Sequence, residues 1–562
     1  MVAGLSQLVS DVVAEGRMTI LDILLIAALA AFVAVWWIRR TPHRGRWLTV
    51  LAGAALVVGL AGIWDDRWQA GAGVVAAAVL LLGLLASRLR RTPPRTGLPW
   101  VSGPLVTLLA AAAVMALVLF PVWPLPKPAG PHPVGVRSFE VTDPGRPGLI
   151  AARPDEPRRL LVRVWYPASP VKGARPRAYF SDTEARHTAR TLGALVGFPP
   201  FFTYVKHVRT HSYEDAPLLA GAKGLPTVFY SHGYTSFLAQ NTALMEHLAS
   251  HGYVVVSVQH TYDSSTTVFP DGDVAPADPE LFRLAREESP DAQETAALQR
   301  RAIGGATLDD RLDGYLRLRE AALAGRGDRL LKSGVIWAAD RMLVHDRLQG
   351  GDVPAPIREI AAAARLDRVG EMGMSFGGAT SGTVCILDPR CGAGVNLDGG
   401  DFPFQAFGRD MPVPFLMFHS DLTGLSRQLG AEVEGPAHSF NEFSYESFGG
   451  AGAKSDLYRV QLRESKHLGL SDFSLFVRRP ARDALFGSTP ARVTIGAQND
   501  FVMGFFDRHL RGLANGFPQG QMEAYRDWVT PLTGDAVRDW WAGKTEAERE
   551  AIEARIAAAR GD

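Results

Sequence analysis

The sequence predicts an α/β protein, with a mainly parallel sheet flanked by helices, preceded by a four-helix transmembrane domain. Three features predict this: four long apolar stretches near the N-terminus, a Pro-rich connector behind them, and alternating strand-like and helix-like segments in the rest. With 562 residues the chain is too long for one ordinary domain, so a membrane part and a second folded part are expected.

The four apolar stretches cover residues 20–38, 47–64, 70–87 and 101–123. Each is close to the length that a helix needs to cross about 30 Å of hydrocarbon at about 1.5 Å per residue. A cleaved signal peptide explains them less well, because three further apolar stretches follow the first. The spans hold almost no ionisable side chains, which argues against a transporter. We therefore expect residues 1–124 to form a membrane anchor.

Arginines set the expected orientation of the spans, because cytoplasmic loops of membrane proteins carry an excess of basic residues. They lie in the first and third connections: Arg39, Arg40, Arg44, Arg46, Arg88, Arg90, Arg91 and Arg95. Both connections should face the cytoplasm, so the N-terminus and everything after Pro124 should lie outside it, in a multi-pass protein of the cell membrane. The Gly and Ala content of the spans predicts close helix packing and allows a homo-oligomer through the spans.

After a Pro-rich linker at 125–134, residues 135–534 carry the alternation typical of a parallel sheet. An apolar run at 227–231, a helix-like segment at 240–250 and a β-branched run at 253–258 make a strand, a helix and a strand in that order. Further strands are predicted at 368–372, 394–397, 415–419 and 457–462, with a closing amphipathic helix at 501–513.

Two charged helical regions are assigned to the surface. Residues 279–348 are interpreted as helices that mostly flank the sheet rather than as a lid over a site. The tail, 535–562, is interpreted as a surface appendage.

Residues 373–377 match the pattern G-x-S-x-G, which in the α/β-hydrolase fold places a nucleophilic serine on a sharp turn between a strand and a helix. The match follows a predicted strand and precedes a helical segment, so we expect Ser375 to be the nucleophile of a serine esterase. The expected oxyanion donors are the backbone N–H groups of Phe376 and of Tyr234, which lies in the loop after the first parallel strand. The neighbouring His232 is interpreted as bracing that loop.

A serine nucleophile needs a histidine base and an acid that orients the histidine. His467 is favoured as the base because it follows the last predicted strand in a polar turn; the other downstream histidines are His419, His438 and His509. The acid is Asp398 or Asp421, each at the end of a strand, and the pattern alone does not separate them. This chemistry needs no metal and no organic cofactor.

The charge balance and the two cysteines argue against other classes of protein. The formal net charge is +1, so no global field favours nucleic acid as a partner. Cys385 and Cys391 are too few for a disulfide-rich scaffold or a Cys-based zinc finger. Their spacing favours two free or buried thiols over a disulfide, whereas an extracytoplasmic location would favour the bridge.

Several motifs, in order, resemble the platelet-activating factor acetylhydrolase family of α/β-hydrolases and, more loosely, the predicted dienelactone hydrolases. They are VWYPA at 164–168, FYSHGY at 229–234, LASHGYVVVSVQH at 248–260, GMSFGGAT at 373–380, CGAGVNLDGG at 391–400 and SKHLGLSDF at 465–473. The resemblance implies that Asp398 rather than Asp421 is the acid, that His467 is the base, and that Tyr234 and Phe376 donate to the oxyanion.

The resemblance also implies a lipid substrate, namely short or oxidised acyl chains on phospholipids. Two departures from the family affect which of its properties can be carried over to this chain. Met374 stands where the family usually has His, and the secreted members have no counterpart of the four spans. The alternatives are a general carboxylesterase or polyester hydrolase of the same fold, and a non-catalytic hydrolase-like membrane protein that binds a partner or lipid.

Overall fold

The computed structural model describes residues 18–38, 43–89, 99–148, 155–169, 173–286, 292–325, 328–424, 441–452 and 454–561. The chain divides into two compact units. The first comprises Met1–Leu125, Ala178–Thr210 and Leu475–Arg482, and the second comprises Pro126–Arg177, His211–Ser474 and Asp483–Asp562. The units therefore do not follow the order of the chain, because two segments from within residues 135–534 pack with the N-terminal helices.

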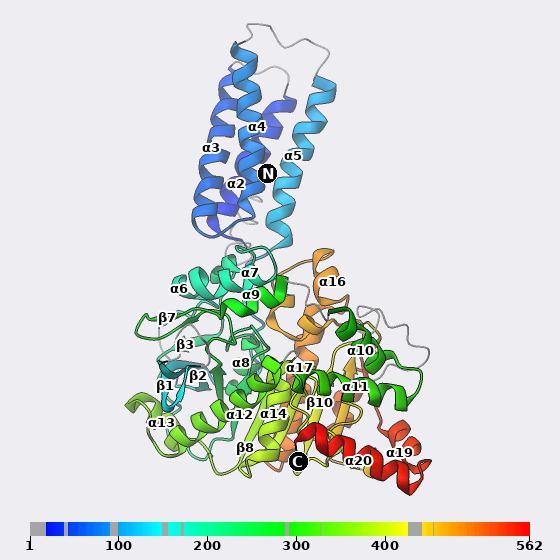
Figure 1. Ribbon diagram of the computed structural model, residues 1–562. Coiled ribbons are helices and arrows are strands. Elements are labelled where there is room, and N and C mark those ends of the chain that lie inside the picture. The colour runs from blue at the N-terminus through cyan, green and yellow to red at the C-terminus, as the bar shows by residue number, and fades with distance from the viewer. Residues whose placement is uncertain are drawn as a thin grey trace. The chain divides into compact units, whose positions relative to one another are not determined.

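The first unit contains the N-terminal helices α2 (Ile20–Trp37), α3 (Arg44–Trp64), α4 (Ala70–Leu89) and α5 (Pro99–Leu119), which run side by side in Figure 1. Of the described helices, α2, α3 and α4 are long and apolar enough to cross a membrane. The fourth predicted span coincides largely with α5, in which the residues with described side chains, Gly103–Leu119, form an apolar helix. Glycines allow the helices to approach closely: a Cβ on Gly73 would lie 2.7 Å from Leu25.

The segments Ala178–Thr210 and Leu475–Arg482 pack against the ends of these helices within the first unit. The indole of Trp68, in the turn between α3 and α4, contacts the rings of Phe120, Phe198 and Phe201. The Lys206 ammonium lies 2.9 Å from an Asp66 carboxylate oxygen. The short helices α6 (Asp182–Glu184) and α7 (Arg190–Leu195) also belong to this unit.

The second unit is built on a ten-stranded sheet with the order β12-β11-β10-β9-β8-β4-β5-β2-β1-β3. From β5 to β11 the strands are parallel, whereas β1, β2 and β5 pair antiparallel in sequence and β12 pairs antiparallel with β11. The strands are β1 (Val134–Pro147), β2 (Pro157–Pro167), β3 (Ser212–Glu214), β4 (Thr227–Ser231), β5 (Val254–Gln259), β8 (Val369–Met374), β9 (Cys391–Leu397), β10 (Phe415–His419), β11 (Leu457–Leu462) and β12 (Val529–Pro531). A separate hairpin joins β6 (Thr267–Val268) and β7 (Val274–Ala275).

Helices cover both faces of this sheet, and the predicted fold class is confirmed. On one face α12 (Asp328–Gln349) packs against α14 (Phe376–Leu387), beside α13 (Ala355–Ala363); on the other α8 (Thr242–Ser250) packs against α17 (Ala491–His509). The central strands β4, β5, β8, β9 and β10 are buried along their whole length, as doubly covered parallel strands require. The remaining helices are α9 (Pro279–Arg286), α10 (Ala292–Gly304), α11 (Leu308–Leu323), α16 (Ala481–Phe486), α18 (Gln519–Ala524), α19 (Asp535–Ala542) and α20 (Glu546–Arg560).

The C-terminal tail is not a surface appendage, contrary to the expectation from its charge. Helices α19 and α20 bury Val537, Ile556 and Ala559 in a cluster with Phe404 and Phe407. These apolar residues are spaced along otherwise charged helices, so the charged faces point to solvent while one stripe completes a core. The tail thereby helps to hold the loop that follows β9.

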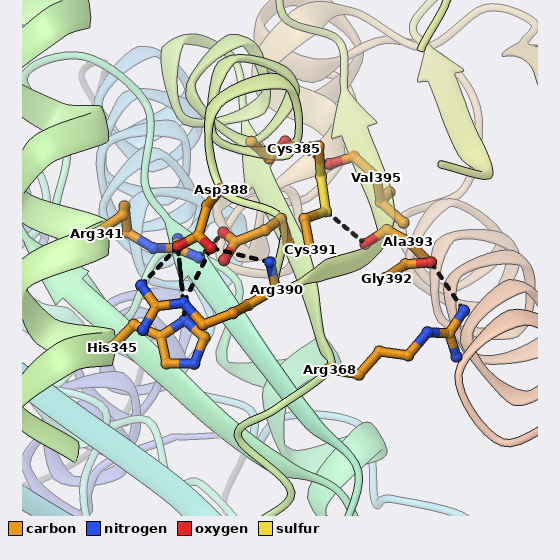
Figure 2. Close-up of a disulfide and its surroundings, with 12 residues drawn as sticks. Arg341, His345, Arg368, Cys385, Asp388, Arg390, Cys391, Gly392, Ala393 and Val395 are labelled. Carbon is orange, nitrogen blue, oxygen red and sulfur yellow. Dashed lines mark hydrogen bonds and ion pairs between the residues drawn. A yellow bond between two sulfur atoms is a disulfide. The ribbon is translucent and has the colours of Figure 1, made fainter. Parts of the chain in front are cut away.

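Cys385 and Cys391 form a disulfide, so the preference for two thiols was wrong. Figure 2 shows the bridge between the end of α14 and the start of β9. In the connection, Asp388 pairs with Arg390 and its carbonyl accepts a hydrogen bond from the Cys391 N–H (3.0 Å). This tight turn folds the segment back and brings the two Cα atoms to 5.0 Å, within bridging distance.

Candidate active site

Ser375 lies on a sharp turn between β8 and α14, with a positive φ of 55° and ψ of −122°. L-residues rarely adopt this conformation, and it lifts the serine side chain out of the strand. The flanking glycines are sterically required: a Cβ on Gly377 would lie 2.0 Å from the Ser231 carbonyl oxygen, and one on Gly373 would lie 2.2 Å from the Gly377 backbone. The local sequence therefore folds into the strand, turn and helix that the pattern predicts.

The structure brings Ser375, His467 and Asp398 into one hydrogen-bonded chain. The Ser375 Oγ lies 2.9 Å from the His467 Nε2, and the His467 Nδ1 lies 2.7 Å from the Asp398 Oδ2. The three residues follow β8, β11 and β9, whose carboxyl ends meet at one edge of the sheet. The side chain of His467 is 35% exposed, whereas that of Asp398 is fully buried.

The carboxylate of Asp398 is held by more than His467. Its Oδ1 accepts a hydrogen bond from the Ser420 backbone N–H (2.8 Å), and its Oδ2 accepts one from the Ser420 hydroxyl (2.6 Å). Burial by itself would raise the pKa of Asp398, but the imidazoles of His419 and His467 beside it outweigh this effect and hold that pKa well below its ordinary value. An ionised acceptor at this position selects the His467 tautomer with the proton on Nδ1, which leaves Nε2 free to accept the serine proton.

Asp421, the other candidate acid, is hydrogen-bonded to backbone N–H groups and not to His467. Its Oδ1 accepts the backbone N–H of Thr423 (3.0 Å), and its Oδ2 accepts the backbone N–H of Glu464 (2.9 Å). Asp421 therefore braces the chain three residues before His467 instead of contacting the imidazole. The structure places Asp398, and not Asp421, against the histidine.

The other candidate histidines do not reach Ser375. His419 Nδ1 lies 3.7 Å from the Asp398 Oδ1, whereas His467 contacts the Oδ2 of the same carboxylate. His509 lies on α17 beside the Tyr458 hydroxyl (3.1 Å). His438 lies outside the residues that the structure describes.

The expected oxyanion donors lie close to Ser375. A Cβ on Gly233 would lie 3.4 Å from the Ser375 Cβ, so the peptide between Gly233 and Tyr234 runs past the serine. Among the described residues, no protein acceptor takes a hydrogen bond from the Tyr234 N–H or from the Phe376 N–H at the start of α14. Two free backbone donors beside a serine hydroxyl are what a tetrahedral oxyanion requires.

The sequence did not predict the aromatic cluster that surrounds Phe376, the residue after Ser375. The ring of Phe376 contacts those of Tyr234 (centroids 5.2 Å apart), Trp337 (4.8 Å) and Phe402 (5.8 Å). Trp337 comes from α12, and Phe402 is 43% exposed in the loop after β9. The available signal was a tryptophan in an otherwise charged helical region, which was interpreted only as flanking the sheet.

No group of three or more His, Cys, Asp or Glu side chains in the described part of the chain is arranged to hold a metal ion. The polar groups that converge near the serine are instead the imidazole, the carboxylate and the two backbone N–H groups described above. Such a set can activate a hydroxyl and stabilise an oxyanion.

Comparisons with known proteins support the fold and an esterase assignment. A family model described as platelet-activating factor acetylhydrolase, isoform II, matches residues 120–303, which include Tyr234 and end before Ser375. Among solved structures, the chain resembles a ferulic acid esterase from Streptomyces cinnamoneus, with 22% sequence identity and a TM-score of 0.50 over 73% of this chain and 98% of that chain. The structural match shows the α/β-hydrolase fold. Together with the family match and the Ser–His–Asp geometry, it supports the assignment of the chain as a carboxylic ester hydrolase.

Proposed function

We propose that the chain is a membrane-anchored serine esterase that cleaves acyl esters of lipids through an acyl-enzyme. The observation that carries this proposal is the continuous chain of hydrogen bonds from Ser375 through His467 to Asp398 at the strained turn. A buried carboxylate, an imidazole of fixed tautomer and a serine on an exposed turn form a unit that has no evident structural purpose of its own. Its geometry suits nucleophilic acyl transfer.

In the proposed reaction the Ser375 Oγ attacks the ester carbonyl carbon while the His467 Nε2 accepts the hydroxyl proton. The N–H groups of Tyr234 and Phe376 donate to the oxyanion that forms. His467 then returns the proton to the leaving alcohol, and the acyl group stays on Ser375. Water, deprotonated by His467, attacks the acyl-enzyme and releases the acid. Throughout, Asp398 stays ionised and keeps the imidazole oriented.

A membrane location is supported by the three long apolar helices and by the arginines at their ends. Arg44 and Arg46 begin α3, and Arg88 lies in the last turn of α4, so these helix ends are proposed to face the cytoplasm. With α5 as a fourth span, everything after it would then be extracytoplasmic. The disulfide between Cys385 and Cys391 supports this side, because such bridges persist in oxidising compartments. Association of the spans into a homo-oligomer stays a prediction.

Lipid esters are favoured as substrates because the family match is to an acetylhydrolase of platelet-activating factor and because a membrane-anchored enzyme is close to its lipid substrate. A second candidate is a general carboxylesterase that accepts aromatic acids. The exposed ring of Phe402 against Phe376 favours it, and the structural neighbour is a ferulic acid esterase. The two candidates differ in substrate and share the mechanism.

The proposal is tested with the full-length protein in detergent or nanodiscs. A fluorophosphonate probe should label the wild type and should not label Ser375→Ala. The wild type should release fatty acid from phospholipids with short or oxidised acyl chains, and Ser375→Ala should not. Cleavage of methyl ferulate or polyester but not of phospholipids would move the assignment to the second candidate. No labelling and no ester cleavage by the wild type would favour a non-catalytic binding protein.

A further inference from the structure

A second Ser–His–Asp chain lies behind the oxyanion loop, formed by Ser231, His260 and Asp340. The Ser231 Oγ lies 3.0 Å from the His260 Nε2, and the His260 Nδ1 lies 2.9 Å from the Asp340 Oδ2. Ser231 ends β4, His260 follows β5, and Asp340 lies on α12. The mechanism above does not use any of these three residues.

The directions of the hydrogen bonds in this second chain are determined by its neighbours. The Asp340 carboxylate can only accept, so the His260 Nδ1 carries the ring proton and donates it to Asp340. The Nε2 of the neutral ring therefore accepts the Ser231 hydroxyl proton, and an N–H of the Arg341 guanidinium donates to the Ser231 Oγ at 3.0 Å. Burial lowers the pKa of His260 to about 4, against the opposing effect of Asp340, so the imidazole is neutral at ordinary pH.

This second chain cannot meet a substrate. Ser231, His260 and Asp340 each have no exposed surface. The carboxylate of Asp340 is also neutralised by cations, since the Arg158 Nε lies 3.1 Å from its Oδ1 and the Arg146 Nη1 lies 3.0 Å from the same atom. A buried, fully paired serine has no route to an ester carbonyl.

The hydrogen-bonded set of Ser231, His260 and Asp340 is instead connected, through His232, to the peptide between Gly233 and Tyr234, which carries the proposed oxyanion donor. The His260 backbone N–H donates to the His232 Nε2 (3.2 Å), and the His232 Nδ1 donates to the Gly233 carbonyl (2.7 Å). That carbonyl also accepts the Ser236 N–H (3.0 Å). In a trans peptide the C=O and N–H bonds point in opposite directions, so fixing the Gly233 carbonyl fixes the direction of the Tyr234 N–H.

We propose that Ser231, His260 and Asp340, acting through His232, are positioning residues that aim the Tyr234 N–H at the oxyanion, and that they are not a second nucleophilic centre. Ser231 holds the end of β4 where the loop begins, and His260 presents the backbone donor that holds the His232 ring. This inference rests on the proposed esterase function. It assigns a role to a buried polar network that packing alone does not require, because a fully apolar core would avoid the cost of desolvation.

The test compares His232→Phe with His232→Asn in the full-length protein. Phe keeps the ring volume and removes both hydrogen bonds, whereas the Asn amide can still donate to the Gly233 carbonyl. Losing one oxyanion donor costs about 10²- to 10³-fold in kcat, so a misaligned donor should cost about 30-fold or more. We expect His232→Phe to lower kcat on a p-nitrophenyl ester by about that factor with KM within about 2-fold, and His232→Asn to recover most of the loss.

Ser231→Ala extends the test to the buried chain, and Ser250→Ala is its matched control. Ser250 is also buried and hydrogen-bonded: its hydroxyl accepts the Gly130 N–H (3.1 Å), donates to the His247 carbonyl (2.7 Å) and lies 3.4 Å from the His251 Nδ1. Both variants should lower the thermal unfolding midpoint, but only Ser231→Ala should lower kcat. The double variant Ser231→Ala with His232→Phe should have a kcat only slightly below that of His232→Phe alone, because both substitutions act on the same peptide.

Three results would overturn the inference while leaving the esterase assignment intact. They are a kcat within about 3-fold of wild type for His232→Phe, equal losses for His232→Phe and His232→Asn, or kcat losses that multiply in the double variant. Wild-type protein that neither cleaves esters nor reacts with a fluorophosphonate would remove the proposed function itself, and this inference with it.

Discussion

Replacing Asp398 by Asn tests the proposed catalytic chain most directly, because the two residues have nearly the same shape and differ in one acceptor atom. The Oδ1 position accepts the fixed Ser420 backbone N–H, so the Asn carbonyl oxygen must occupy that position. The Asn amide nitrogen then occupies the Oδ2 position, 2.7 Å from the His467 Nδ1. It can only donate there, and this selects the tautomer in which Nε2 carries the proton and cannot accept one from Ser375.

The expected loss follows from that change of tautomer. In a serine protease the corresponding substitution lowers kcat about 10⁴-fold with the geometry intact, so we expect a loss of about 10³- to 10⁴-fold for Asp398→Asn. KM should stay within a few-fold, because the substrate contacts are unchanged.

The assay is initial-rate hydrolysis of p-nitrophenyl butyrate by the purified full-length protein, with fluorophosphonate labelling as a second readout. Asp421→Asn is the matched control, since Asp421 braces the Glu464 N–H rather than His467. It should cost less than about 10-fold. A loss under about 10-fold for Asp398→Asn, or a larger loss for Asp421→Asn, would refute the assignment of the acid.

Three further predictions concern stability and specificity. Replacing Cys385 and Cys391 together by Ala should lower the free energy of unfolding by about 2 kcal/mol, because the bridge closes a loop across a separation of only 6 residues; an unchanged denaturation midpoint would contradict this. Burial, followed by the charge of His251, lowers the pKa of His247 to about 4, so the unfolded chain binds a proton between about pH 6.5 and pH 4 that the folded chain does not. Stability should therefore fall as the pH falls through this window, and His247→Gln should remove about 1.4 kcal/mol per pH unit from that slope in thermal or chemical unfolding; parallel slopes would count against it. Phe402→Ala should raise KM for aromatic or long-chain esters about 5-fold and leave acetate esters nearly unchanged, whereas an equal effect on all esters would exclude a role in substrate selection.

The parts of the fold and the site that the sequence could predict are those with a strong local signal. A β-branched run such as the one at β5 favours a buried strand, and the apolar lengths of α2, α3 and α4 are sufficient for spans. The glycines around Ser375 predict the strained turn, because a larger side chain at those positions would clash with the backbone. His467 could be proposed because a polar turn after the last parallel strand lies at the sheet edge that carries the nucleophile.

The parts that the sequence could not predict depend on contacts between distant segments. Nothing in the local pattern of α20 says that Ile556 meets Phe407, and nothing near residue 385 says that Asp388 and Arg390 turn the chain back. The packing of Trp68 against Phe198 and Phe201 likewise joins segments more than 100 residues apart in the chain. Hydrophobic periodicity reports which face of an element is buried and does not report its partner.

The two candidate acids show how the tertiary structure distinguishes residues that sequence spacing does not: Asp398 contacts His467, and Asp421 does not. The Ser375 N–H donates to the Leu397 carbonyl (2.7 Å), and a Cβ on Gly399 would lie 1.9 Å from the Ser375 carbonyl oxygen. The turn that carries Asp398 is thus bonded directly to the turn that carries the nucleophile, and its position relative to Ser375 is fixed by backbone contacts. Asp421 is one strand farther from Ser375, and its carboxylate is already occupied by the chain before His467. The two carboxylates at neighbouring strand ends therefore have different contacts: Asp398 is hydrogen-bonded to the His467 imidazole, and Asp421 is hydrogen-bonded to the loop that precedes His467. These contacts are the basis for proposing Asp398 as the acid.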